Sequence, residues 1–225
     1  MWPRLATALL ASSVLAAGMT AVAAPATAQS GTTACFGADT PVRTKAWWKK
    51  KNPTWSEKRI NSYVLLTEGI AGSAIECLVN EERKKAGIAR LTYNSPLFKA
   101  AKKHVEDAKR YRWWHEDADS ATYHLFRGRR DGANQTDRAR AAGYCKGGSS
   151  WYVKENVYQG WGRAATAREA VRWWMRSPSH RATILDPGMK EAAVSAQHGT
   201  ADSTNRQALN SDIAMVTAQV FGRCR

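Results

Sequence analysis

The sequence has few of the groups that enzymes use for chemistry, and none in a familiar arrangement. Its 225 residues include only five His and four Cys, and acidic side chains number 19 against 34 Lys and Arg. No HExxH, Walker-type phosphate loop, GxSxG, GxGxxG or CxxC stretch occurs. These absences exclude a motif-based assignment as a zinc protease, P-loop nucleotide binder, α/β-hydrolase or zinc ribbon. The chain also lacks an internal repeat.

The overall composition indicates a folded, strongly basic protein. Hydrophobic residues make up 44% and charged residues 24% of the sequence, which is typical of a globular protein. The length suits one mid-sized domain with additional segments. A formal net charge of +15 indicates attraction to polyanions such as cell-wall polymers, anionic lipid or nucleic acid, and says nothing about the fold.

The first 28 residues have the pattern of a secretory signal peptide. Arg4 precedes the uncharged, Ala-rich run Leu5–Ala24, Pro25 breaks the helix, and Ala26-Thr27-Ala28 is an A-x-A cleavage site. A transmembrane anchor is the less favoured alternative, because Ala is only weakly apolar and no basic cluster follows directly. We therefore predict a secreted, extracellular protein with no transmembrane anchor after cleavage.

If the protein is exported, its four cysteines are expected to form disulfides. An even number of cysteines in a secreted chain predicts two disulfides, but four cysteines allow three pairings and the spacing does not choose among them. We favour Cys35–Cys77, which would attach an N-terminal arm to a helix, and Cys145–Cys224, which would attach a mid-chain loop to the last strand.

Residues 29–66 resemble an extension that precedes the main domain. The stretch from Lys45 to Trp55 is rich in both Lys and Trp. Two interpretations remain open: a surface arm for an anionic polymer, or a leader that packs its tryptophans on the domain.

Hydrophobic periodicity and capping residues predict helices early and strands late. Asn94-Ser95-Pro96 is a helix start, and the apolar residues behind it share one helical face. Apolar residues on both faces of 213–221 indicate a central strand covered on both sides. Five helices are predicted: one that ends at Gly87, one that follows Asn94, and three over 136–142, 166–177 and 180–185. The predicted strands are 151–159, 190–198 and 213–221.

Several polar residues are candidates for chemistry, although spacing alone does not join them. His104 falls on the apolar face of its predicted helix, so we interpret it as a hydrogen-bonded core histidine. His115, Glu155 and His180 lie after that helix, in a predicted strand and at a helix start.

Seven short motifs, in order, resemble bacterial domains of the CAP superfamily (cysteine-rich secretory proteins, antigen 5 and pathogenesis-related proteins). Each motif is weak by itself, but their shared order over residues 67–225 is specific. The motifs are Cys77 to Gly87, Leu97 to Asp107, Trp113-Trp114-His115, Asp137-Arg138 with Gly143-Tyr144, Lys154 to Val157, Trp174 to Leu185, and Val220-Phe221-Gly222.

The resemblance implies an α+β fold, a three-layer α-β-α sandwich, and a cleft in which His115, Glu155 and His180 converge. Two neutral imidazoles and a carboxylate would suit Zn²⁺ or another divalent metal, or would form a polar cluster held by hydrogen bonds. The catalytic residues are unknown, and the same three side chains are the candidates.

Two departures from the family pattern bear on this cleft. Lys154 stands where the family usually has Gly, so its amine would pair with Glu155 or crowd the cleft. Residues 191–196 lack the family's usual glycines, which predicts a tighter cleft wall.

Together these features predict a monomeric secreted protein that binds an extracellular ligand, namely a lipid, an anionic cell-envelope polymer or a partner protein. A metal-assisted extracellular hydrolase of peptides or esters is the alternative. Nucleic acid is not an expected partner, because an anionic envelope explains the charge of an exported protein more simply.

Overall fold

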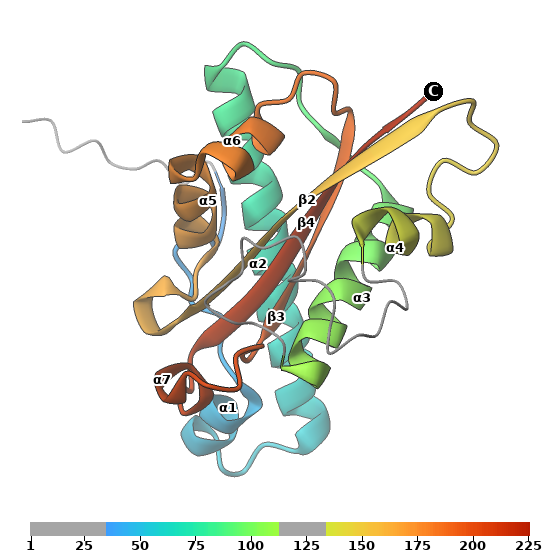
Figure 1. Ribbon diagram of the computed structural model, residues 1–225. Coiled ribbons are helices and arrows are strands. Elements are labelled where there is room, and N and C mark those ends of the chain that lie inside the picture. Colours follow the sequence, from blue (N-terminus) through green and yellow to red (C-terminus); the bar gives the residue numbers. More distant parts are fainter. Residues whose placement is uncertain (1–34, 113–133) are drawn as a thin grey trace, which may run out of the picture. The chain divides into compact units, whose positions relative to one another are not determined.

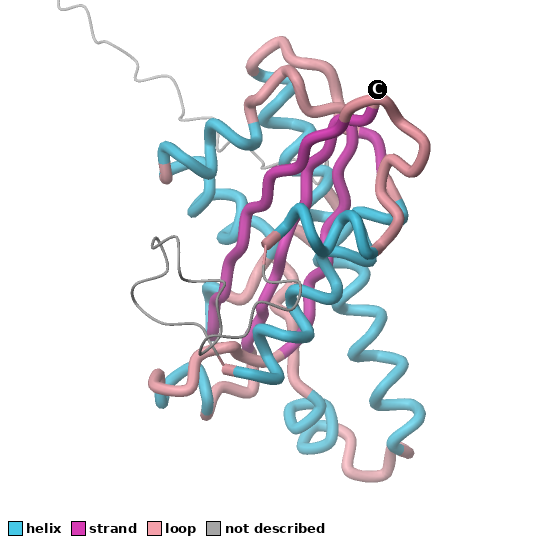
Figure 2. Tube along the Cα trace, turned by 45° about the vertical axis from the view of Figure 1, so that its right-hand side comes forward, coloured by secondary structure: helices cyan, strands magenta, loops and turns pink. Residues whose placement is uncertain are grey.

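The computed structural model describes residues 35–112 and 134–225. These residues form one four-stranded sheet with helices on both faces (Figures 1 and 2). The elements are α1 Lys45–Lys51, α2 Glu57–Lys85, β1 Thr92–Tyr93, α3 Ser95–Tyr111, α4 Gln135–Ala141, β2 Trp151–Trp161, the 3₁₀ turn η2 Gly162–Ala164, α5 Ala167–Arg176, α6 Pro178–Ile184, β3 Glu191–His198, α7 Arg206–Leu209 and β4 Ala214–Cys224.

The strand order is β1-β3-β4-β2, so β4 lies inside the sheet. β2 and β3 each pair antiparallel with β4, and the short β1 pairs parallel with β3. All nine residues from Ala214 to Gly222 are buried, which confirms the prediction of a central strand covered on both faces.

Helices α2, α5 and α6 cover one face of the sheet, and α3 and α4 cover the other. Each face has its own apolar cluster. Ile75, Trp174 and Phe221 belong to the first, while Leu97 and Val153 belong to the second. This arrangement confirms the expected α-β-α sandwich.

Local sequence explains where the helices begin. The Asn94 side chain accepts a hydrogen bond from the Leu97 amide (3.1 Å), and the Thr166 hydroxyl accepts one from the Glu169 amide (3.3 Å). Both residues are N-caps at the predicted helix starts, because their side chains satisfy amides that the first turn leaves without partners.

Helix α2 is longer than the sequence analysis expected. It begins at Glu57, so the predicted boundary between extension and domain at residues 66 and 67 falls inside it. One window of this helix is long and apolar enough to cross a membrane. Its inward residues, including Ile60 and Val79, are buried in the fold, as in a core helix of a globular domain.

The end of α2 is held by one buried side chain. The Arg83 guanidinium is fully buried and donates to the backbone carbonyls of Ala89, Ile184, Asp186 and Met189 at 2.7–3.1 Å. This residue therefore joins α2 to the loop between α6 and β3.

Both disulfides have the predicted pairing. Cys35 is bonded to Cys77 and Cys145 to Cys224, with Cα–Cα distances of 5.5 and 5.4 Å. The first attaches the N-terminal segment to α2, and the second attaches the loop after α4 to the end of β4.

Candidate functional site

Glu155 lies in a buried polar cluster on the face of β2 that α3 and α4 cover. Its side chain is only 5% exposed. Oε2 accepts a hydrogen bond from Nη2 of Arg138 on α4 at 2.7 Å and lies 3.4 Å from Nε2 of His104 on α3. His104 is 3% exposed, which confirms its predicted place in the core.

The cluster is an ion pair rather than an open ligand set. The Arg138 guanidinium is 3% exposed and places a permanent positive charge against the Glu155 carboxylate. A divalent cation bound to Glu155 would share this low-dielectric site with that charge, which is unfavourable. The sequence analysis did not predict Arg138 as the partner of Glu155; its only hint was the place of Arg138 in a family motif.

His180 lies in the first turn of α6, on the opposite face of β2. Its Nδ1 is hydrogen-bonded to the Ser177 hydroxyl at 2.7 Å, and its ring packs edge-on against Trp173 with ring centroids 4.9 Å apart. The backbone carbonyl of His180 accepts a hydrogen bond from the Asn156 side chain at 3.0 Å. Asn156 therefore points toward α6, and its neighbour Glu155 points the other way.

Strand geometry places the Glu155 side chain and the hydrogen bond from Asn156 to His180 on different faces of β2. Successive side chains of a strand project to opposite faces, so Glu155 and Asn156 cannot share one. His115 lies outside the described residues. The joint site of His115, Glu155 and His180 thus stays a prediction, and the structure places Glu155 with Arg138 and His104.

Lys154 also projects away from Glu155. Its Nζ donates to Oδ2 of Asp186, in the loop after α6, at 2.9 Å. This hydrogen bond raises the pKa of Lys154, and partial burial only partly opposes the shift. Lys154 therefore neither pairs with Glu155 nor covers it.

The described residues do not suit a divalent metal. Within residues 35–112 and 134–225, no group of three or more His, Cys, Asp and Glu side chains is placed to hold a metal ion. The chemistry near Glu155 agrees, because Arg138 already neutralises the carboxylate.

Comparisons with known proteins give one family and several structures. The model of the family "CAP: Cysteine-rich secretory protein family" matches residues 77–216. A search of the curated proteins gives no significant match.

Three solved structures resemble the chain in fold. An extracellular protein with an SCP domain from Bacillus anthracis has a TM-score of 0.49 and 16% identity, over 70% of this chain and 41% of that one. An outer surface protein from Borrelia burgdorferi has a TM-score of 0.46 and 17% identity, over 67% and 90%. A cysteine-rich secretory protein from Staphylococcus aureus has a TM-score of 0.40 and 16% identity, over 66% and 37%. The chain therefore matches less than half the length of the first and third proteins.

Proposed function

Because this chain belongs to the cysteine-rich secretory protein (CAP) family, we propose that it is a secreted binding protein whose ligand is an anionic polymer of the cell envelope. The observation that carries the proposal is a basic, aromatic surface formed by α1 and the first turn of α2. We call it the α1 surface. Its exposed cations are Lys45, Lys49, Lys50, Lys51, Lys58 and Arg59.

The cations of the α1 surface are poorly balanced by acids. Glu57 is the only acidic side chain between Arg43 and Ile60, and it lies 3.4 Å from Lys49. Three consecutive lysines, Lys49–Lys51, form the last turn of α1. Repeated negative charges on a polymer would meet several of these amines at once, which favours binding at low ionic strength.

The aromatic side chains hold this surface in place. Trp48 packs against both Trp55 and Tyr63, with ring centroids 6.0 and 5.2 Å apart. The guanidinium groups of Arg43 and Arg59 lie over the rings of Trp47 and Trp55 at 4.4 and 4.3 Å. The two interpretations of the extension are thus compatible: tryptophans attach α1 to α2, while lysines face solvent.

Secretion is supported by two independent features. Two disulfides are typical of proteins that fold in an oxidising compartment. The sequence before Cys35 carries the predicted signal peptide, so an envelope polymer is a partner that the protein would meet.

The proposal is tested by binding to polyglycerol phosphate, with neutral dextran as the uncharged polymer. We expect binding to polyglycerol phosphate that weakens steeply from about 50 to 500 mM NaCl, because salt screens exposed charges. The triple variant Lys49→Gln, Lys50→Gln, Lys51→Gln should lower the affinity roughly tenfold at low salt.

A matched control removes three cations at the other end of α2. Lys84→Gln, Lys85→Gln and Arg90→Gln give the same change in net charge about 40 Å away along the helix. We expect this variant to bind almost as well as the unmodified protein. Equal losses in the two variants would show that only net charge matters, and salt-insensitive binding would contradict the proposal.

A metal-assisted hydrolase is the second candidate and has less support. Of its three candidate residues, Glu155 supplies the carboxylate, which is already paired with Arg138 at 2.7 Å. The hydrolase is tested by comparing the metal content of the purified protein with that of the variants His115→Ala and His180→Ala. Metal that both substitutions remove, together with turnover on peptide or ester substrates, would favour the hydrolase.

A further inference from the structure

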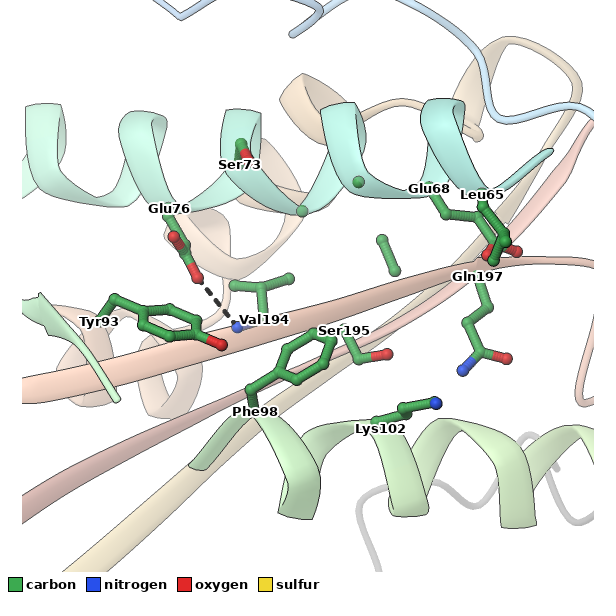
Figure 3. Close-up of a pocket in the computed structure, with 13 residues that line it drawn as sticks. Leu65, Glu68, Ser73, Glu76, Tyr93, Phe98, Lys102, Val194, Ser195 and Gln197 are labelled. Atoms are coloured by element: carbon green, nitrogen blue, oxygen red, sulfur yellow. Dashed lines mark hydrogen bonds between the residues drawn. The ribbon is translucent and has the colours of Figure 1, made fainter. Parts of the chain in front are cut away.

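A groove lies between α2 and α3, with one edge of β3 as its floor (Figure 3). We call it the α2–α3 groove. Its volume is about 400 Å³. This groove is separate from Glu155, because the groove lies at β3 and Glu155 lies on β2, with β4 between the two strands. The residues that matter for its chemistry are Leu65, Glu68, Glu76, Tyr93, Phe98 and Lys102.

The two carboxylates of the groove differ in how they are used. Glu68 makes two contacts with His198, because its Oε1 accepts from the His198 backbone amide at 2.9 Å and lies 2.6 Å from the His198 ring nitrogen Nδ1. Glu76 accepts one hydrogen bond through Oε1, from the Val194 amide at 3.2 Å. Among the described residues its Oε2 has no hydrogen-bond partner, so Glu76 has capacity to spare.

A smaller cavity shares Glu76 and Tyr93 with the lining of the groove. Its volume is about 20 Å³, and Asn80, Tyr93 and Gln219 contribute to its lining. A cavity of this size holds one water-sized group. Gln219 is 1% exposed, and its Oε1 has no hydrogen-bond partner in the described part of the chain. A buried acceptor without a donor is unfavourable, so a group that donates a hydrogen bond to Oε1 would be stabilised here.

The groove has apolar side chains on both walls, and Glu68, Lys102 and Gln197 are among its polar side chains away from Glu76. The rings of Tyr93 and Phe98 lie 6.4 Å apart, and Tyr93 is 60% exposed. On the α2 side Leu65 is exposed and also borders a second hollow that Leu66 and Phe36 line. An aliphatic chain would cover this strip and remove apolar surface from water.

We propose that the α2–α3 groove binds a primary ammonium group carried on an aliphatic chain. The ammonium enters the small cavity, where it donates to Glu76 and to Oε1 of Gln219, and the chain lies along Tyr93, Phe98 and Leu65. An ammonium is close to water in size and has three donors, whereas a neutral or anionic head group has no matching charge. This proposal goes beyond the α1 surface and does not depend on it.

The test uses the secreted chain with both disulfides intact and isothermal titration calorimetry. The probes are n-octylammonium, n-butylammonium and n-octanol. We expect n-octylammonium to bind more tightly than n-butylammonium, because the longer chain covers more apolar surface. We expect n-octanol to bind at least about tenfold more weakly, because it lacks the charge.

Substitutions locate the ammonium. Glu76→Gln keeps an oxygen for the Val194 amide but removes the charge, and should lower n-octylammonium affinity at least about tenfold. Gln219→Leu should lower it several-fold. The matched control is Glu68→Gln in the same groove, which should leave affinity within about twofold.

The pH dependence gives a second measurement. Burial raises the pKa of Glu76, and the hydrogen bond from Val194 only partly opposes that shift. Glu76 therefore loses its charge at a higher pH than an exposed Glu, and ammonium affinity should fall as pH falls through this pKa. The other titratable groups near it are Glu68, His198, Tyr93 and Lys102, so the decisive comparison is with Glu76→Gln, whose affinity should no longer follow the titration of Glu76.

Three results would overturn the proposal. Equal binding of n-octylammonium and n-octanol would show an apolar groove without an ammonium site. No binding by a folded protein would show that the small cavity holds only water. If Glu76→Gln fails to fold, an undiminished affinity in Gln219→Leu would be decisive against it.

Discussion

The buried pair of Arg138 and Glu155 gives the sharpest prediction about the candidate site. Replacing Arg138 with Met keeps much of the side-chain volume and removes the positive charge. Glu155, 5% exposed, would then be a buried carboxylate with no guanidinium beside it and with His104 Nε2 3.4 Å away. Removing one partner of a buried ion pair destabilises a protein by about 3–5 kcal/mol.

Urea denaturation at pH 7, followed by tryptophan fluorescence and by far-UV circular dichroism, measures this loss. Domains of this size unfold with about 5–15 kcal/mol, so Arg138→Met should shift the midpoint visibly. The double variant Arg138→Met, Glu155→Leu removes both charges and should recover most of the loss, because an apolar pair often replaces a buried ion pair without cost.

The outcome also decides the role of Glu155. A loss below about 1 kcal/mol in Arg138→Met would mean that solvent or another cation reaches the carboxylate, as at an exposed pair. That result would refute the interpretation of a closed ion pair and would restore Glu155 as a candidate ligand or base. A double variant no more stable than Arg138→Met would refute the reasoning about charge.

Three further outcomes follow from the structure. Replacing Cys35 and Cys77 by Ala opens a loop with a sequence separation of 42 residues and should lower the free energy of unfolding by about 4 kcal/mol, measured in urea with the other disulfide intact. Burial raises the pKa of Tyr158 to about 12, so stability should fall as pH rises from about 10 toward this value, and Tyr158→Phe should remove that part of the alkaline loss. Partial burial opposes ionisation of Asp186, but hydrogen bonds from Lys154 and the Gly188 amide outweigh it and lower the pKa of Asp186, so Lys154→Met should cost about 0.5–1 kcal/mol at pH 7 and nothing once acid has protonated Asp186.

The sequence predicted those parts of the fold that depend on neighbouring residues. Caps such as Asn94 and Thr166 act within one helical turn, so their residue types suffice to find them. The strand at 213–221 was recognisable because both of its faces are apolar, and the observed strand begins one residue later. The pairing of the cysteines was a choice among three that the structure confirms.

The start of α2 was missed, although the sequence held a sign of it. Ile60 and Val64 are four residues apart and both are buried on the inward face of the helix. The lysines and tryptophans nearby favoured an extension instead. What makes α1 part of the fold is the contact of Trp48 with Tyr63 on α2, which brings together residues from two elements and has no local signature.

The candidate site depended on facts that are not local. Strand alternation implies that Glu155 and Asn156 face opposite ways, but not which helix covers which face. The structure supplies that information, with Arg138 on the side of Glu155 and the carbonyl of His180 on the side of Asn156. Spacing along the chain carries no trace of either contact.

The two carboxylates of α2 show how one helix can protect a sheet edge and still leave a site beside it. β1 pairs with only the start of β3, so the outer amides of Val194 and His198 have no described strand partner and donate to the carboxylates of Glu76 and Glu68 instead. Eight residues of helix rise about 12 Å and four residues of strand about 13 Å, so the two spacings match.

Gly72 lies midway between these carboxylates, and a Cβ there would be 3.6 Å from the Val194 carbonyl oxygen, which is ordinary contact. The helix therefore runs close along the strand edge and blocks the addition of another strand. At the His198 end, the Glu68 carboxylate also contacts the His198 ring. At the Val194 end, Glu76 has no such second contact, and Gln219, whose Oε1 has no described hydrogen-bond partner, lines the small cavity beside it. Glu68 thus makes two contacts with His198 and Glu76 only one with Val194, so Glu76 has the larger remaining capacity, and that capacity points to a ligand.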